Sequence, residues 1–89
     1  MTPDELKKEI AHEEMLFADG FDDALIGTVS VFTSEGQTEK ALYDLDECRQ
    51  ILMDRDNITF EEADEYLSFN VLGAYVGQHT PAFATIMKK

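Results

Sequence analysis

The sequence has few of the residues that build covalent or metal-bound frameworks. It holds one cysteine, two prolines and no tryptophan in 89 residues. The single cysteine, Cys48, excludes a disulfide within the chain, which is typical of a reducing compartment. No apolar run approaches the ~20 residues that a membrane helix needs, and the charged first residues do not resemble a secretory signal. We therefore expect a cytoplasmic protein.

Basic residues are scarce as well. The chain has 7 lysines and arginines against 19 aspartates and glutamates, which gives a formal net charge of -12. The acidic residues concentrate in residues 1–23 and 54–65, none follows Glu65, and residues 88–89 are both lysine. Such a charge repels nucleic acid and anionic membranes. A macromolecule that is bound through charge is therefore expected to present a basic surface.

Length and composition predict one globular domain over residues 1–89. Hydrophobic residues make up 44% of the chain and aromatic residues 10%, which excludes a wholly disordered acidic tail. A chain of this size buries only roughly 60–70% of its unfolded surface, so its stability is marginal. Contact with a partner or with a second copy of the chain would therefore contribute noticeably to the stability of such a domain.

A first helix is predicted over residues 3–19. Thr2 is a suitable cap, Pro3 fits the first helical position, and Glu5 stands where a capping-box acid belongs. Gly20 can adopt the left-handed conformation that ends a helix. The apolar stripe of this helix is thin, so we expect it to pack loosely.

A β-hairpin is predicted next. Residues 24–32 alternate in polarity and are rich in β-branched side chains, which indicates a strand. Residues 34–37 supply a turn, and residues 39–43 return as a second strand.

Two helices and a third strand follow. Asp44 begins a helix that runs to Met53, and Thr59 opens a second helix with the clearest capping box of the chain, ending at Gly77. Residues 82–87 are short enough for a third strand beside the hairpin. The expected fold is α+β in the order α-β-β-α-α-β, with helices packed on a small antiparallel sheet of the hairpin and the C-terminal strand.

The acidic clusters do not match a metal site. Residues 54–65 resemble a calcium loop only faintly, because Ile58 and Thr59 stand where an oxygen ligand and a glycine are required. The cluster of Asp19, Asp22 and Asp23 would suit a hard cation. Such residues more often form a turn and a charged strand edge. We therefore expect neither a metal nor a cofactor.

The sequence also lacks a catalytic set. Cys48 lies on an apolar helix stripe near Asp44 and Glu47, and nearby carboxylates raise a thiol pKa, the opposite of what a nucleophile needs. Neither His12 nor His79 has a partner that sequence spacing supplies, and a pair of Cys48 with His79 is a minor alternative. We therefore expect a protein that is not an enzyme.

One segment of the last predicted helix is unusual. Asn70 falls on the side expected to be buried, and Gly73 sits mid-helix, where glycine costs about 0.5–1 kcal/mol relative to alanine. A buried amide needs hydrogen-bond partners. One interpretation is a tight contact between helix and sheet. The other is a concave patch, rimmed by Asn70, Tyr75 and Thr80, that receives a ligand or a partner side chain.

The chain also resembles a known family, and a series of short segments carries the likeness. These segments are residues 21–27 (FDDALIG), 42–44 (LYD), Cys48, 51–56 (ILMDRD), 60–63 (FEEA), 65–66 (EY), 69–70 (FN), 73–74 (GA), 76–77 (VG) and 80–81 (TP). In this pattern the chain is similar to a family of small, uncharacterised proteins encoded by bacteriophages and prophages. The resemblance implies a phage accessory protein in a bacterial cytoplasm, and it implies no activity. The N-terminal helix lies outside it.

Two classes of function remain. The first is a non-enzymatic accessory protein that binds and modulates a host or phage protein. Its special case is an acidic mimic of nucleic acid, which binds a basic nucleic-acid-binding protein through carboxylates of the first helix and of residues 61–65. The second is a small-molecule-binding protein with a pocket near Asn70, Tyr75 and Thr80. The candidate binding residues are Asp22, Asp23, Tyr43, Glu61, Glu62, Asn70, Gly73, Tyr75 and Thr80.

Self-association is a third alternative. The C-terminal stretch has no acidic residue and is rich in apolar side chains. It would complete a sheet across a homodimer. The sequence does not decide between this arrangement and a monomer.

Overall fold

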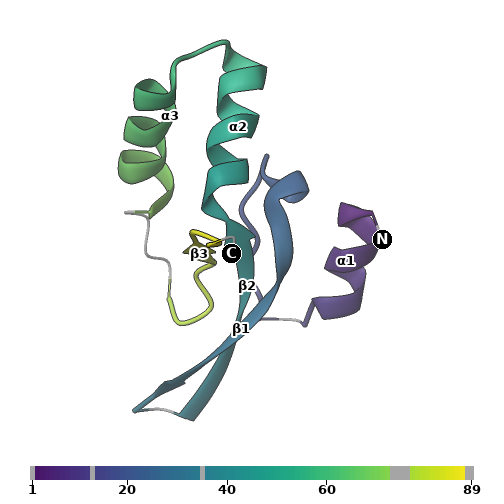
Figure 1. The fold of residues 1–89 in the computed structure, drawn as a ribbon. Helices are drawn as coiled ribbons and strands as arrows, with labels where there is room; N and C mark the ends of the chain where they lie inside the picture. The colour runs from purple at the N-terminus through teal and green to yellow at the C-terminus, as the bar shows by residue number, and fades with distance from the viewer. Residues whose placement is uncertain (1, 13, 35, 73–76, 88–89) are drawn as a thin grey trace.

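The computed structural model describes residues 2–12, 14–34, 36–72 and 77–87, with the side chain of Leu72 left out. It is an α+β fold in the predicted order α-β-β-α-α-β, with two short helical turns added (Figure 1). The elements are α1 (Pro3–Ile10), the 3₁₀ turn η1 (Asp22–Ala24), β1 (Leu25–Thr33), β2 (Gly36–Asp44), α2 (Leu45–Asp56), α3 (Phe60–Leu67), the π-helical turn η2 (Ser68–Leu72) and β3 (Ala82–Ala84).

The predicted hairpin is confirmed. β1 and β2 pair antiparallel from Leu25 opposite Tyr43 to Thr33 opposite Gly36, with a bulge between Leu25 and Gly27. Both strands run further toward the turn than the sequence indicated, so the hairpin forms a long arm that extends from the body of the molecule (Figure 1). Near its tip the Phe32 side chain is 81% exposed.

The third strand lies beside the hairpin, as predicted, but its direction differs. β3 pairs parallel to β2, with Leu42 opposite Ala82 and Asp44 opposite Ala84, so the sheet of order β1-β2-β3 is mixed. The prediction of a purely antiparallel sheet is wrong on this point. The chain leaves β2 along α2, returns along α3, and reverses once more at the turn that the Gly77 carbonyl and the Thr80 amide close (Figure 1). That last reversal gives β3 the direction of β2.

The first helix is shorter than the predicted range 3–19. α1 has the expected capping box at Thr2, but it ends at Ile10, and Ala11 is already extended. The chain leaves the helix because tertiary contacts compete for it: Met15 is buried, and the Ala18 amide donates to the Tyr43 hydroxyl at 2.8 Å. No residue of α1 itself is fully buried.

The other two helix starts are confirmed. The Asp44 side chain accepts hydrogen bonds from the Asp46 and Glu47 amides, and Thr59 forms a complete capping box with Glu62. α2 continues to Asp56, where Asn57 adopts a left-handed conformation with φ 52°. These caps set where α2 and α3 begin, and the two helices lie antiparallel to each other (Figure 1).

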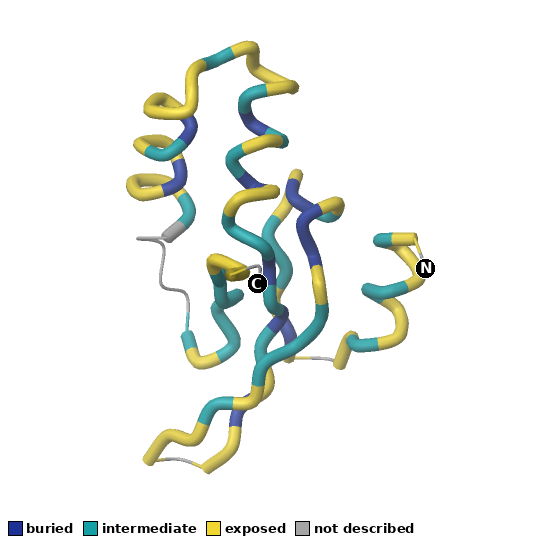
Figure 2. The backbone as a smooth tube through the Cα atoms, viewed as in Figure 1, coloured by how far each residue is buried: buried dark blue, intermediate teal, exposed yellow. Residues whose placement is uncertain are grey.

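The core lies where α2, α3 and the base of the hairpin meet (Figure 2). The largest fully buried side chains are those of Tyr43, Leu52, Leu67 and Cys48. Tyr43 stacks on Phe83 of β3, with ring centroids 5.4 Å apart, which ties the third strand to the core. The inner faces of α2 and α3 pack against this core, whereas the outer face of α3 is exposed to solvent (Figure 2).

Candidate functional site

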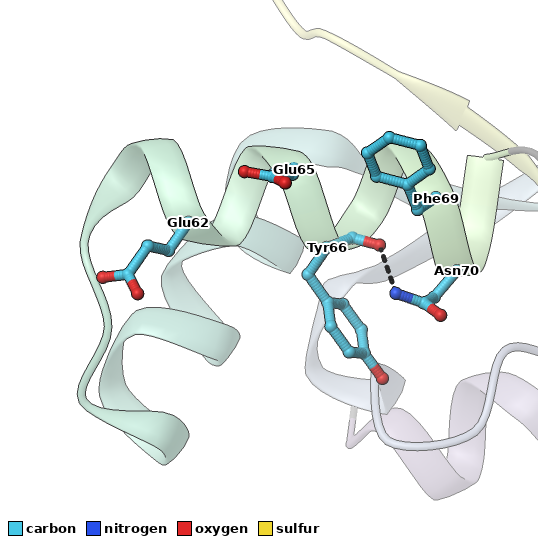
Figure 3. Close-up of a pocket in the computed structure, with 5 residues that line it drawn as sticks. All are labelled: Glu62, Glu65, Tyr66, Phe69 and Asn70. Carbon is cyan, nitrogen blue, oxygen red and sulfur yellow. Dashed lines mark hydrogen bonds between the residues drawn. The ribbon is translucent and has the colours of Figure 1, made fainter.

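A shallow hollow lies on the outer face of α3 and η2 (Figure 3). It has a volume of about 300 Å³ and is lined by Glu62, Glu65, Tyr66, Phe69 and Asn70. The residues recur at intervals of three and four, so they share one side of the helix. All five are exposed, and the Phe69 side chain is exposed to 77%. We call this surface the α3–η2 face.

The opposite side of the same helix explains why this face points to solvent. Ala63 and Leu67 are fully buried, which fixes the rotation of α3 about its axis. Glu62 is held at the helix start, because its side chain accepts from the Thr59 amide at 3.1 Å. The Glu62 carboxylate is therefore held at the first turn of α3, toward the capped end of the helix (Figure 3).

The π-helical turn changes the expected orientation of Asn70. The sequence placed Asn70 on the buried side of a continuous α-helix, and that prediction is wrong, because Asn70 is exposed. A π-helical residue turns through a smaller angle than an α-helical one. Asn70 is thereby rotated outward, and Val71 lies against the core instead. The Asn70 side-chain amide donates to the Tyr66 carbonyl at 3.2 Å, which keeps it beside the Tyr66 ring (Figure 3).

The predicted patch of Asn70, Tyr75 and Thr80 is only partly described. Gly73 and Tyr75 lie outside the described residues. Thr80 belongs to the turn before β3, where its hydroxyl donates to the Gly77 carbonyl at 2.6 Å. Thr80 is not among the residues that line the hollow, whereas Asn70 is. The hollow therefore joins Asn70 to Glu62 of the predicted candidates, and Glu61 is exposed on the same helix.

The remaining candidates lie elsewhere in the fold. Tyr43 is fully buried in the core, so its side chain is not part of an exposed binding surface. Burial raises the pKa of its hydroxyl, and the bond from Ala18 opposes this. Asp22 pairs with Lys7 at 3.1 Å, while Asp23 is exposed in η1. Among the described residues, no three His, Cys, Asp or Glu side chains gather in a way that would hold a metal ion.

Cys48 is buried, and its thiol is not an activated nucleophile. Burial, and after it the charge of Asp44, raises the pKa of its thiol to about 12. At neutral pH the thiol is therefore protonated, and the thiolate that a nucleophile needs is absent. The expected effect of the neighbouring carboxylates is confirmed.

His79 has contacts that sequence spacing did not reveal. Its Nε2 lies 3.0 Å from a Glu14 carboxylate oxygen, and its Nδ1 lies 3.3 Å from the Glu39 carbonyl. The His12 ring meets it edge-on, with centroids 5.3 Å apart. These contacts join the N-terminal segment, β2 and the C-terminal turn, so His79 ties parts of the fold together.

Comparison with known proteins does not identify the family of this chain. No protein-family model matches the chain, and no curated protein or solved structure matches it significantly. In the part of the chain that the structure describes, no helix has both the length and the apolar character required to cross a membrane. The resemblance to phage proteins therefore stays a prediction, and the function is argued from the α3–η2 face.

Proposed function

We propose that this chain is a non-enzymatic accessory protein that binds and modulates another protein through the α3–η2 face. The observation that carries the proposal is the exposure of Tyr66 and Phe69, 43% and 77%, on a helix whose other side is fully packed. Aromatic side chains are the residues that most often dominate binding energy at protein interfaces. The resemblance to phage proteins supports a bacterial cytoplasm as the place of action and a host or phage protein as the partner.

The charge of the face favours a basic partner. Glu62 and Glu65 line the hollow, and the whole chain carries a formal net charge of -12. Complementary charge steers association and excludes acidic competitors. A basic nucleic-acid-binding protein fits this description. Exposed rings beside the carboxylates favour a mixed apolar and ionic contact over a purely electrostatic mimic of nucleic acid.

The small-molecule alternative has less support. Pockets for small molecules typically bury 70–90% or more of the ligand surface. The hollow has about 300 Å³, and every residue that lines it is exposed. Such a surface suits the side chain of a larger partner better than a free molecule.

The proposal is tested by capture from bacterial lysate on the immobilised full chain, with a matched pair of variants. Phe69→Ser removes the ring at the hollow. Phe32→Ser removes a ring of similar exposure, 81%, at the hairpin tip. We expect one partner to be retained by the wild type and by Phe32→Ser, and to be reduced about tenfold or more by Phe69→Ser, which is the size of effect seen at interface hot spots.

Washes at low and at roughly half-molar salt separate the apolar from the ionic contribution to binding, because the Debye length falls to a few ångströms at the higher salt. A partner that survives high salt supports the mixed contact. A partner that is lost at high salt and is insensitive to Phe69→Ser indicates an acidic mimic instead. Loss on Phe32→Ser alone would contradict the proposal.

A further inference from the structure

The helix pair α2–α3 already holds one arginine of its own. The Arg49 guanidinium donates from Nε to Asp64 at 2.8 Å and from Nη1 to Asp46 at 2.7 Å. It also lies over the Phe60 ring, 5.2 Å from the ring centroid. Two carboxylates and one aromatic face therefore hold a guanidinium whose side chain is only 16% exposed. This contact shows which groups on these helices satisfy a guanidinium.

The α3–η2 face presents the same kinds of group to solvent. Its hollow is lined by the Glu65 carboxylate and the rings of Tyr66 and Phe69, while the Glu62 carboxylate lies at the end toward the helix start (Figure 3). Within the described residues Glu65 makes no ion pair, and Glu62 is engaged by the Thr59 amide alone. The face is thus complementary in charge to a cation, and among the described residues no basic side chain pairs with Glu65.

We propose that this hollow binds an arginine side chain carried by an extended segment of the partner protein. The inference rests on the proposed function and names the chemistry of its partner. A guanidinium is planar, stacks on aromatic rings, and donates to carboxylates through a rigid fork, whereas a lysine ammonium is a strongly hydrated point charge. The open hollow of about 300 Å³ leaves room for the aliphatic stem. The exposed Phe69 ring then meets an apolar neighbour of that arginine.

The test is an NMR titration of the full chain with three capped tripeptides that differ only at the central residue: Leu-Arg-Leu, its lysine version and its citrulline version. Citrulline keeps the shape of arginine and removes the charge. We expect amide shifts at residues 62–70 with the arginine peptide, about three- to tenfold weaker binding of the lysine peptide, and no saturable shift with citrulline.

Two charge variants test whether the arginine peptide binds at the hollow. Glu65→Gln removes a carboxylate that lines it, and Glu61→Gln removes one from the same helix outside it. Both change the net charge equally. We expect Glu65→Gln to weaken the arginine peptide about fivefold or more, with little effect of Glu61→Gln.

The outcomes separate the two proposals. Equal binding of the arginine and citrulline peptides, or equal effects of the two charge variants, would overturn arginine recognition. If Phe69→Ser still abolishes lysate capture in that case, the proposed function stands with another partner chemistry. If no peptide shifts residues 62–70 and Phe69→Ser leaves capture unchanged, both proposals fail.

Discussion

Replacing Leu67 by alanine is expected to lower the free energy of unfolding by about 2–5 kcal/mol. The Leu67 side chain is fully buried where α3 packs on the core, so its removal leaves a cavity between packed elements. Small domains have only about 5–15 kcal/mol of total stability, so a loss of this size is a large part of it. Urea unfolding followed by circular dichroism measures the change.

The neighbouring residue Phe69 provides the control. Phe69→Ala lies two positions further along, at a side chain that is 77% exposed. We expect it to change the free energy of unfolding by less than about 0.5 kcal/mol, as surface substitutions usually do. Equal losses for Leu67→Ala and Phe69→Ala would show that the face assigned to binding is part of the core, and would contradict the site.

The second large effect is expected at alkaline pH. The pKa of the Cys48 thiol is raised from 9.0 to about 12, chiefly by burial and then by the charge of Asp44. Burial also raises the pKa of Tyr43 above its ordinary 10.0. An acid whose pKa is raised by folding contributes stability that is complete below its unfolded pKa. That contribution is lost as pH rises through the folded pKa, so stability should decline from pH 9 toward pH 12.

The size of this decline follows from linkage. Each pKa unit is worth about 1.4 kcal/mol, so Cys48 alone accounts for about 4 kcal/mol when it is fully titrated. Urea unfolding at several pH values between 7 and 11 measures the slope. The variant Cys48→Ala lacks the titrating group and should show a shallower slope, whatever its stability at pH 7. An unchanged slope, or rapid reaction of the native thiol with a thiol reagent at pH 8, would contradict the buried thiol.

The elements that the sequence predicted are those with local signals. The β-branched alternation of residues 24–32 and the capping box of Thr59 and Glu62 involve only neighbouring positions, and both appear in the structure. The net charge and the position of Cys48 on an apolar helix stripe also follow directly from the sequence. These features need no knowledge of the tertiary fold.

The predictions from the sequence are wrong where contacts between residues far apart in the chain determine the structure. α1 ends at Ile10 because the following segment is held by Met15 in the core and by Tyr43 of β2. The direction of β3 depends on a turn after α3, and the contact of Glu14 with His79 joins opposite ends of the chain. Sequence spacing contains none of this information.

The candidate site was predicted in part. Glu62 and Asn70 were named from the sequence, and Glu65 was included only among the carboxylates of residues 61–65, whereas Tyr66 and Phe69 were not named as site residues. Their spacing of three and four along the helix was a usable signal, because it places two acids and two rings on one face. The π-helical turn that rotates Asn70 into this face has no clear signature in the sequence.

Photocrosslinking from the α3–η2 face is the most direct measurement of where the partner binds. The full chain carries benzoylphenylalanine at position 69 or, as the control, at position 32, and is irradiated in bacterial cells. Both positions hold exposed phenylalanines in the native sequence, so neither change disturbs the core. We predict one discrete adduct of the chain with a single partner protein from position 69 and none from position 32. A discrete adduct from position 32 with none from position 69 would contradict the assignment of the α3–η2 face as the binding surface.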